Sequence, residues 1–219
     1  MQSAWRCRKS TGGGGRAGAA RARGGNLGGG GILGTANVAL GGTLAPGNSP
    51  GMLTVGNVVL AGGSFYEWQV QNATNHSTGY DKLTVTGNLD LTGATSGSRI
   101  TIRIASLLGA GDGNTAGNPL NFSAPGVTDQ PTFFQFGQVG GVLLNNGVSI
   151  SDVFAFNVDG FRYSDGSTSN AGLWAIDWNQ GTGAITLTAV PEPSTYGFGL
   201  GVLALAAAAI RRRRKQKAA

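Results

Sequence analysis

Short apolar runs separated by turn-forming residues fill residues 32–190, and they restrict this stretch to a β fold. The runs are bounded by Gly, Asn, Asp or Pro, which is the pattern of strands that alternate with tight turns. Within one run, Ile100, Ile102 and Ile104 alternate with more polar neighbours, so one face of that strand points inward. No stretch before Pro191 shows the period of about 3.6 residues that marks an amphipathic helix. We therefore expect an all-β body.

Strands are expected wherever β-branched, aromatic or leucine residues gather between two turn signals. These positions are 52–55, 58–60, 64–70, 83–85, 89–91, 99–106, 142–144, 148–150, 153–158, 173–177 and 184–189. Residues 107–131 break this pattern with repeated Gly and Pro. A stretch of that length without apolar periodicity is expected to be a loop or an insertion between strands.

Glycine accounts for 40 of the 219 residues and shows no three-residue period, so the chain is not collagen-like. Residues 1–31 mix Gly, Ala and Arg, and such a composition buries too little apolar surface to offset the entropy of ordering. We expect this segment to be disordered. It is interpreted either as a miscalled start or as a flexible basic arm.

The positive charge of the chain lies in its two terminal segments and not in the body. The net charge is +6 at pH 7, whereas residues 36–190 carry four basic and nine acidic groups. A strongly basic protein often binds nucleic acid through a folded basic surface. Because the body of this chain is mildly acidic, we expect no nucleic-acid partner.

The C-terminal segment, residues 191–219, differs from the body and has three parts in order. A Pro-Glu-Pro motif comes first and consists of Pro191, Glu192 and Pro193. An apolar run without a charge follows at residues 196–210. A basic cluster at 211–217 comes last and begins with Arg211, Arg212, Arg213 and Arg214.

Residues 196–210 are expected to form a short, single transmembrane helix. A helix of this length extends about 22 Å against a hydrocarbon core of about 30 Å, and flanking arginines reach the interface. Arginine clusters stay on the cytoplasmic side, so Arg211 to Arg214 place the body outside the cytoplasm. A buried C-terminal helix is the alternative, and consecutive arginines beside the apolar run disfavour it.

These three parts resemble the PEP-CTERM sorting signal of Gram-negative bacteria, which has a Pro-Glu-Pro motif, a short transmembrane helix and an Arg-rich end. The resemblance implies recognition by an exosortase, a membrane transpeptidase-like protease. It also implies export, a transient inner-membrane anchor and delivery to the cell surface or extracellular matrix. The prolines keep the adjoining segment extended, which suits a protease.

A second resemblance covers residues 34–105. Residues 42–56, and residues 80–91 with the sequence Tyr-Asp-Lys-Leu-Thr-Val-Thr-Gly-Asn-Leu-Asp-Leu, are similar to autotransporter-associated β-strand repeats. In that family such segments stack as rungs of a right-handed parallel β-helix, with glycine and asparagine at the corners. The resemblance implies a β-helix, or solenoid, over at least 34–105. Residues 132–190 either continue it or form an antiparallel sheet or sandwich.

Residue types that carry catalysis are sparse. Cys7 and His76 are the only cysteine and histidine, which disfavours internal disulfides, Cys/His metal sites and nucleophile–histidine catalysis. Ser49 stands in a Gly-x-Ser-x-Gly pattern, but the next residue, Pro50, has no N–H to donate to an oxyanion. We expect the protein to have no enzymatic activity, no cofactor and no metal site. Three aspartates are interpreted as turn residues and not as Ca²⁺ ligands: Asp112, Asp159 and Asp165.

Trp174 and Trp178 are the candidate binding residues. They are four positions apart, so in a strand both side chains lie on one face. Such a pair suits stacking on sugar rings, with an exopolysaccharide as the partner. Packing into a core or against a sheet edge is the alternative.

The sequence thus predicts a disordered segment 1–31, an exported β-rich body 32–190 and a sorting signal 191–219. The expected function is that of a structural or adhesin-like protein of the cell surface or extracellular matrix, without a focused site. The alternative is an exopolysaccharide-binding module that uses surface aromatics. A degenerate hydrolase is a third reading, which the lone histidine disfavours.

Overall fold

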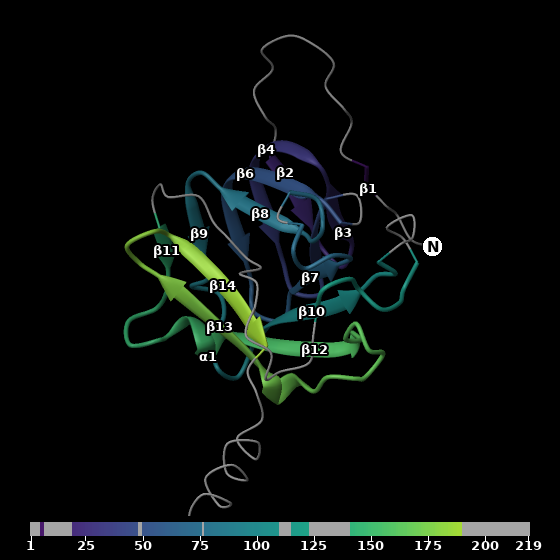
Figure 1. Cartoon of the computed structure of the whole chain (residues 1–219). Coiled ribbons are helices and arrows are strands. Elements are labelled where there is room, and N and C mark those ends of the chain that lie inside the picture. Colours follow the sequence, from purple (N-terminus) through teal and green to yellow (C-terminus); the bar gives the residue numbers. More distant parts are fainter. Residues whose placement is uncertain are drawn as a thin grey trace, which may run out of the picture.

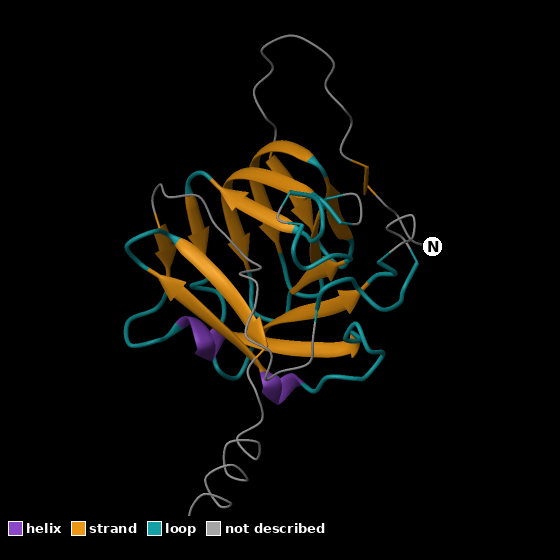
Figure 2. Cartoon of the chain, viewed as in Figure 1, coloured by secondary structure: helices purple, strands orange, loops and turns teal. Residues whose placement is uncertain are grey.

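The computed structural model describes residues 5–6, 19–47, 50–75, 77–109, 115–122 and 141–189. Strands dominate these residues, together with a single-turn α-helix, α1 (Ile150–Val153), and a 3-10 turn, η1 (Ala171–Leu173) (Figure 2). The all-β class expected from the sequence is confirmed. The expected alternation also holds, because Ile100, Ile102 and Ile104 are buried while Arg103 between them is exposed.

Twelve of the described strands form two six-stranded sheets, in which every pairing is parallel. Sheet A contains, in spatial order, β1 (Trp5–Arg6), β3 (Asn26–Gly29), β5 (Thr43–Pro46), β7 (Phe65–Val70), β10 (Ile100–Ser106) and β12 (Phe154–Gly160). Sheet B contains β11 (Gly141–Leu143), β9 (Asn88–Asp90), β6 (Met52–Leu60), β4 (Gly31–Val38) and β2 (Ala19–Ala22), with β8 (Lys82–Val85) also paired to β6.

The chain alternates between the two sheets, so each pass through sheet B and sheet A lies beside the previous one (Figure 1). Parallel neighbours need a crossover, and here the crossover is the strand in the other sheet. The register is regular: Val38 of β4 pairs with Leu60 of β6. In sheet A, Ile102 lies opposite Tyr66 on one side and Phe156 on the other. Side chains of similar character therefore stack in rows.

Tight turns at residues 39–42 and 61–64 carry the chain from sheet B to sheet A, and they repeat the same backbone conformation. Gly41 has a φ of 76° and Gly63 a φ of 73°, a region that only glycine adopts without strain. The N–H of Gly41 donates a 3.0 Å hydrogen bond to the carbonyl of Gly63, and the N–H of Gly63 donates one of 2.9 Å to the carbonyl of Arg99. Each turn therefore lies on the next one.

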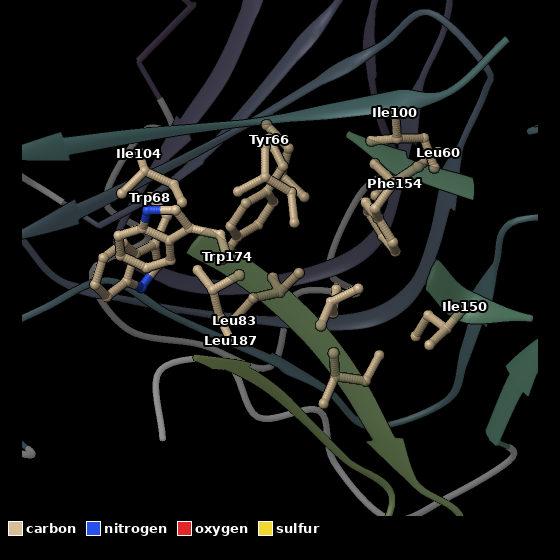
Figure 3. Packing of buried hydrophobic residues seen from close by; sticks show 14 of the residues in the cluster. Leu60, Tyr66, Trp68, Leu83, Ile100, Ile104, Ile150, Phe154, Trp174 and Leu187 are labelled. Carbon is tan, nitrogen blue, oxygen red and sulfur yellow. The ribbon is translucent and has the colours of Figure 1, made fainter. Parts of the chain in front are cut away.

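The two sheets share one hydrophobic core. Tyr66 and Trp68 on β7 are fully buried, and the ring of Trp68 lies 6.2 Å from that of Tyr80. Figure 3 shows labelled side chains from both sheets, among them Leu60, Leu83, Ile100 and Ile104, pointing into this space. Most buried apolar residues of both sheets belong to this cluster, which accounts for the alternating burial along strands such as β7 and β10.

Strands β13 (Trp174–Asn179) and β14 (Ala184–Ala189) form an antiparallel hairpin separate from the two parallel sheets. The hairpin contributes Trp174 and Leu187 to the same core, and the rings of Trp174 and Trp68 lie 6.4 Å apart (Figure 3). Residues 141–189 thus contain both parallel and antiparallel strand pairs. β11 and β12 extend the parallel sheets, whereas the hairpin is antiparallel.

Two local expectations are wrong. Residues 19–31, expected to be disordered, contribute β2, β3 and the start of β4. Their backbone pairs with the neighbouring strands, which offsets the small side chains, and Ala22 is only 4% exposed. Residues 148–150, expected as a strand, instead lead into α1. There the N–H of Ser149 donates a 2.9 Å hydrogen bond to the carboxylate of Asp152, as in a capping box.

The transmembrane helix expected at residues 196–210 lies outside the described residues. Within the part of the chain that the structure describes, no helix has the length and apolar character needed to cross a membrane.

Candidate functional site

Asp81 is the buried charged side chain of the described residues, with 1% of its surface exposed. Its Oδ1 accepts a 2.8 Å hydrogen bond from the N–H of Gly51, and its Oδ2 accepts one of 3.0 Å from the N–H of Gln69. Its backbone carbonyl accepts a hydrogen bond of 3.0 Å from Nε1 of Trp68. Gly51 leads into sheet B and Gln69 lies in sheet A, so this one residue ties the two sheets together.

Burial raises the pKa of Asp81 well above its usual value, and the hydrogen bonds from Gly51 and Gln69 lower it only in part. Burial also raises the pKa of Tyr66, and the charge of Asp81 raises it further. Both carboxylate oxygens of Asp81 already accept backbone hydrogen bonds inside the core. The arrangement is therefore that of a structural clamp and not of a general acid or base facing a substrate.

A groove of about 460 Å³ lies between β12, β13 and the turns beside them. Its walls are mostly apolar, with one cation at the rim, and its lining comprises Arg99, Ser151, Phe154, Ala155, Phe156, Ala171, Trp174, Ala175 and Ile176. Nε of Arg99 donates a 3.0 Å hydrogen bond to the carbonyl of Asp152. Nothing among these residues has the chemistry of a nucleophile with its base.

The two candidate tryptophans share one face of β13, as expected, but that face points into the protein. Trp174 is 4% exposed, and its ring lies 5.2 Å from that of Phe161. Its Nε1 donates a 3.0 Å hydrogen bond to Oγ of Ser169. Trp178 is partly buried and packs against the core cluster. A buried indole presents no face to a sugar ring, so the predicted stacking role of Trp174 is wrong and core packing is the observed arrangement.

Of the three aspartates interpreted from the sequence as turn residues, Asp159 and Asp165 lie within the described residues. Asp165 forms a local turn, in which Oδ1 accepts hydrogen bonds from the N–H and the hydroxyl of Ser167. These hydrogen bonds lower the pKa of Asp165. Within the described ranges no three His, Cys, Asp or Glu side chains gather as a metal site would require. Ser49, His76 and Asp112 lie outside the described residues.

The C-terminal segment of the chain follows the end of β14. Ala189, the last described residue, is 1% exposed and pairs with Trp174 of β13. Pro191, Glu192, Pro193 and the arginines Arg211, Arg212, Arg213 and Arg214 lie outside the described residues. The C-terminal segment is thus attached directly to a strand whose position is fixed by the core.

Comparison with known families accounts for this segment. Residues 189–215 match the PEP-CTERM protein-sorting motif. The PEP-CTERM motif implies export and sorting to the cell surface, with an exosortase as the processing partner. The match begins at Ala189, which is the final residue of β14 and the last residue that the structure describes.

Two further comparisons concern the whole chain, with the body included. No curated protein and no solved structure matches the chain. The resemblance of residues 34–105 to autotransporter repeats gains no support from these comparisons. The sequence alone does not identify the Asp81 clamp, because the backbone partners of its carboxylate, Gly51 and Gln69, lie in other segments of the chain.

Proposed function

We propose that this chain is an exported, non-enzymatic structural protein of the cell surface or extracellular matrix, delivered by the PEP-CTERM/exosortase system. The observation that carries the proposal is the PEP-CTERM motif at residues 189–215, which begins at the end of a strand held in the core. A body fixed up to Ala189 and followed directly by a processing motif suits release of the folded body by one cut.

The body is proposed to be a right-handed parallel β-helix. Two parallel sheets that the chain visits alternately, and turns that stack through hydrogen bonds, support this architecture. Such a stack presents long, regular outer faces, whereas its interior is filled with side chains. Its work is therefore mechanical or adhesive and is spread over the surface, in line with an adhesin-like or matrix role.

The C-terminal segment is proposed to act as a transient inner-membrane anchor. Residues 196–210 form the span, and Arg211 to Arg214 hold its end in the cytoplasm. The span is short for a bilayer, which makes it a releasable anchor. The exosortase cuts near the Pro-Glu-Pro motif, where the prolines keep the backbone extended.

Exopolysaccharide stacking on the pair Trp174 and Trp178 is disfavoured, because Trp174 lies in the core. A matrix protein can still contact polysaccharide through its outer faces. Binding to a glycan array that survives replacement of Trp178 by Ala would point to such a surface.

Cell fractionation tests the sorting proposal. The full chain is expressed behind a cleavable export signal in an exosortase-bearing host and in the same host without the exosortase. We expect surface or medium localisation in the first and inner-membrane retention in the second. A matched variant, Pro191→Ala with Glu192→Ala and Pro193→Ala, should remain in the inner membrane of both hosts. Equal surface delivery of this variant would contradict the proposal.

A further inference from the structure

The described strands leave both ends of the stack without a neighbour. In sheet B, β2 pairs only with β4 and β11 pairs only with β9. In sheet A, β1 and β12 are the outermost strands. A strand with one free edge offers a row of backbone donors and acceptors to another chain. All the free edges here belong to parallel strands of one repeating stack, so they can continue it.

The two ends carry opposite charge. Residues 19–47 contain Arg21 and Arg23 and no acidic residue, and both arginines are exposed. Residues 141–189 contain one basic residue, Arg162, and four exposed acidic residues: Asp152, Asp159, Asp165 and Asp177. Arg99 also lies beside Asp152 and donates to its backbone carbonyl, so this end keeps a smaller net negative charge. Hydrogen bonds from Ser149 lower the pKa of Asp152, which keeps its carboxylate charged.

The positions of these charges match the geometry of a continued stack. Arg21 on β2 lies in the outward row that runs through Asn37, Val59 and Asp90 to Leu143 on β11. Arg23 lies in the turn from β2 to β3, and Asp152 lies in α1, within the corresponding connection from β11 to β12. Leu143 at the free edge is 41% exposed, which adds an apolar contact at the same end.

We propose that a second copy of this chain docks end to end, placing its β2 beside β11 and its β1 beside β12. Arg21 and Arg23 of the incoming copy then face the acidic end that carries Asp152 and Asp159. The contact joins unlike surfaces, so it does not close on itself and further copies can add. Opposite charges at the two ends favour this head-to-tail order and disfavour like ends meeting.

Sedimentation velocity of the full chain in mild detergent tests the charge arrangement. We expect open-ended association that grows with protein concentration and weakens with salt. Arg21→Glu with Arg23→Glu, and separately Ser151→Lys with Asp159→Lys, should each weaken association about tenfold or more. Mixing these two variants should restore it, because each then offers the charge that the other lacks. The second pair leaves Asp152 and its hydrogen bonds in place.

A control variant, Lys82→Glu, alters charge on β8, which pairs with β6 inside sheet B and away from both ends, and should associate as the unaltered chain does. Circular dichroism melting shows that each variant is folded. A chain that stays monomeric at all concentrations, or variants that associate undiminished, would overturn the proposal. The latter result would assign association to another surface, such as residues 196–210.

Cysteine cross-linking tests the geometry independently, in chains that carry Cys7→Ser. One chain carries Gly25→Cys, where an added Cβ meets nothing within 4 Å, and the other carries Asn146→Cys in the exposed turn after β11. Head-to-tail docking predicts a disulfide between the two chains in the mixture and much less within either alone. Stronger cross-linking of Gly25→Cys to itself would show that like ends meet, and would overturn the proposal.

Discussion

The carboxylate of Asp81 accepts a 2.8 Å hydrogen bond from the backbone N–H of Gly51, a residue 30 positions earlier in the chain. Its second oxygen accepts one from the N–H of Gln69. Sequence-distant segments of both sheets therefore depend on one buried side chain. The stability of the two stacked sheets is therefore sensitive to the loss of either hydrogen bond to this carboxylate.

Replacing Asp81 by Asn is expected to destabilise the protein. The amide of asparagine offers one acceptor oxygen, so either Gly51 or Gln69 loses its partner inside the core. The loss should lower the free energy of unfolding by about 1–3 kcal/mol, measured by urea denaturation in mildly acidic buffer. Asp90→Asn is the matched control, since Asp90 accepts a local hydrogen bond from Thr92 in an exposed turn. Equal effects of both changes would contradict the clamp.

The direction in which stability changes with pH follows from the direction of the pKa shift of Asp81 on folding. Burial raises this pKa in the folded state above its usual 3.8, so the unfolded chain loses the proton first as pH rises. The stabilisation is therefore fully present below pH 3.8 and is lost as pH rises through the raised value. Urea midpoints of the unaltered protein should fall relative to those of Asp81→Asn over this range. A difference that grows with pH would mean that the folded state favours the charged form.

The glycine in the turn after β4 is expected to be irreplaceable. A Cβ on Gly42 would lie 2.7 Å from the carbonyl oxygen of Ala22, the last residue of β2, where the neighbouring turn begins. Gly42→Ala should therefore push the stacked turns apart and cost about 1–3 kcal/mol in thermal or urea unfolding. Gly25→Ala serves as the control, because its Cβ meets nothing within 4 Å. If the two variants have the same melting temperature, the turns do not pack as described.

Trp174 is expected to matter for folding and not for ligand binding. Trp174→Ala removes a buried indole between Trp68 and Phe161 and should cost about 3–5 kcal/mol. Trp178→Ala should cost clearly less, because Trp178 is only partly buried. Trp174→Phe retains most of the packing and isolates the hydrogen bond to Ser169. Glycan binding that disappears in Trp174→Phe, with an unchanged melting temperature, would restore the binding role.

The strand pattern was predictable where a strand buries every second residue, as β7, β8, β10 and β14 do. The rows that contain Ile102 and Ile104 needed no tertiary information, since the alternation alone fixes the buried face. The same principle placed the strands of the antiparallel hairpin, although not its pairing. The sorting motif was predictable for another reason: its three parts are consecutive in the sequence.

Structural features that depend on contact with another segment of the chain could not be predicted from the sequence. Residues 19–29 contain too few apolar residues to be recognised as strands from the sequence. They form β2 and β3 because their backbone pairs with β4 and β5. The alternation of side chains along a strand also could not show whether the face that carries Trp174 points to solvent or to the core. That depends on which other element packs against this face. Residues 148–150 resemble a strand, but the contact between Ser149 and Asp152 starts a helical turn.

The intact mass of the protein recovered from an exosortase-bearing host tests the central claim most directly. The chain carries an added export signal and a tag between residues 112 and 118, and inner membrane, surface and medium are compared. The account predicts a surface or medium species that has been cut near residues 191–195 and lacks residues 196–219. The same host without exosortase should yield the uncut chain. An uncut chain confined to the inner membrane of both hosts would contradict sorting by the PEP-CTERM motif.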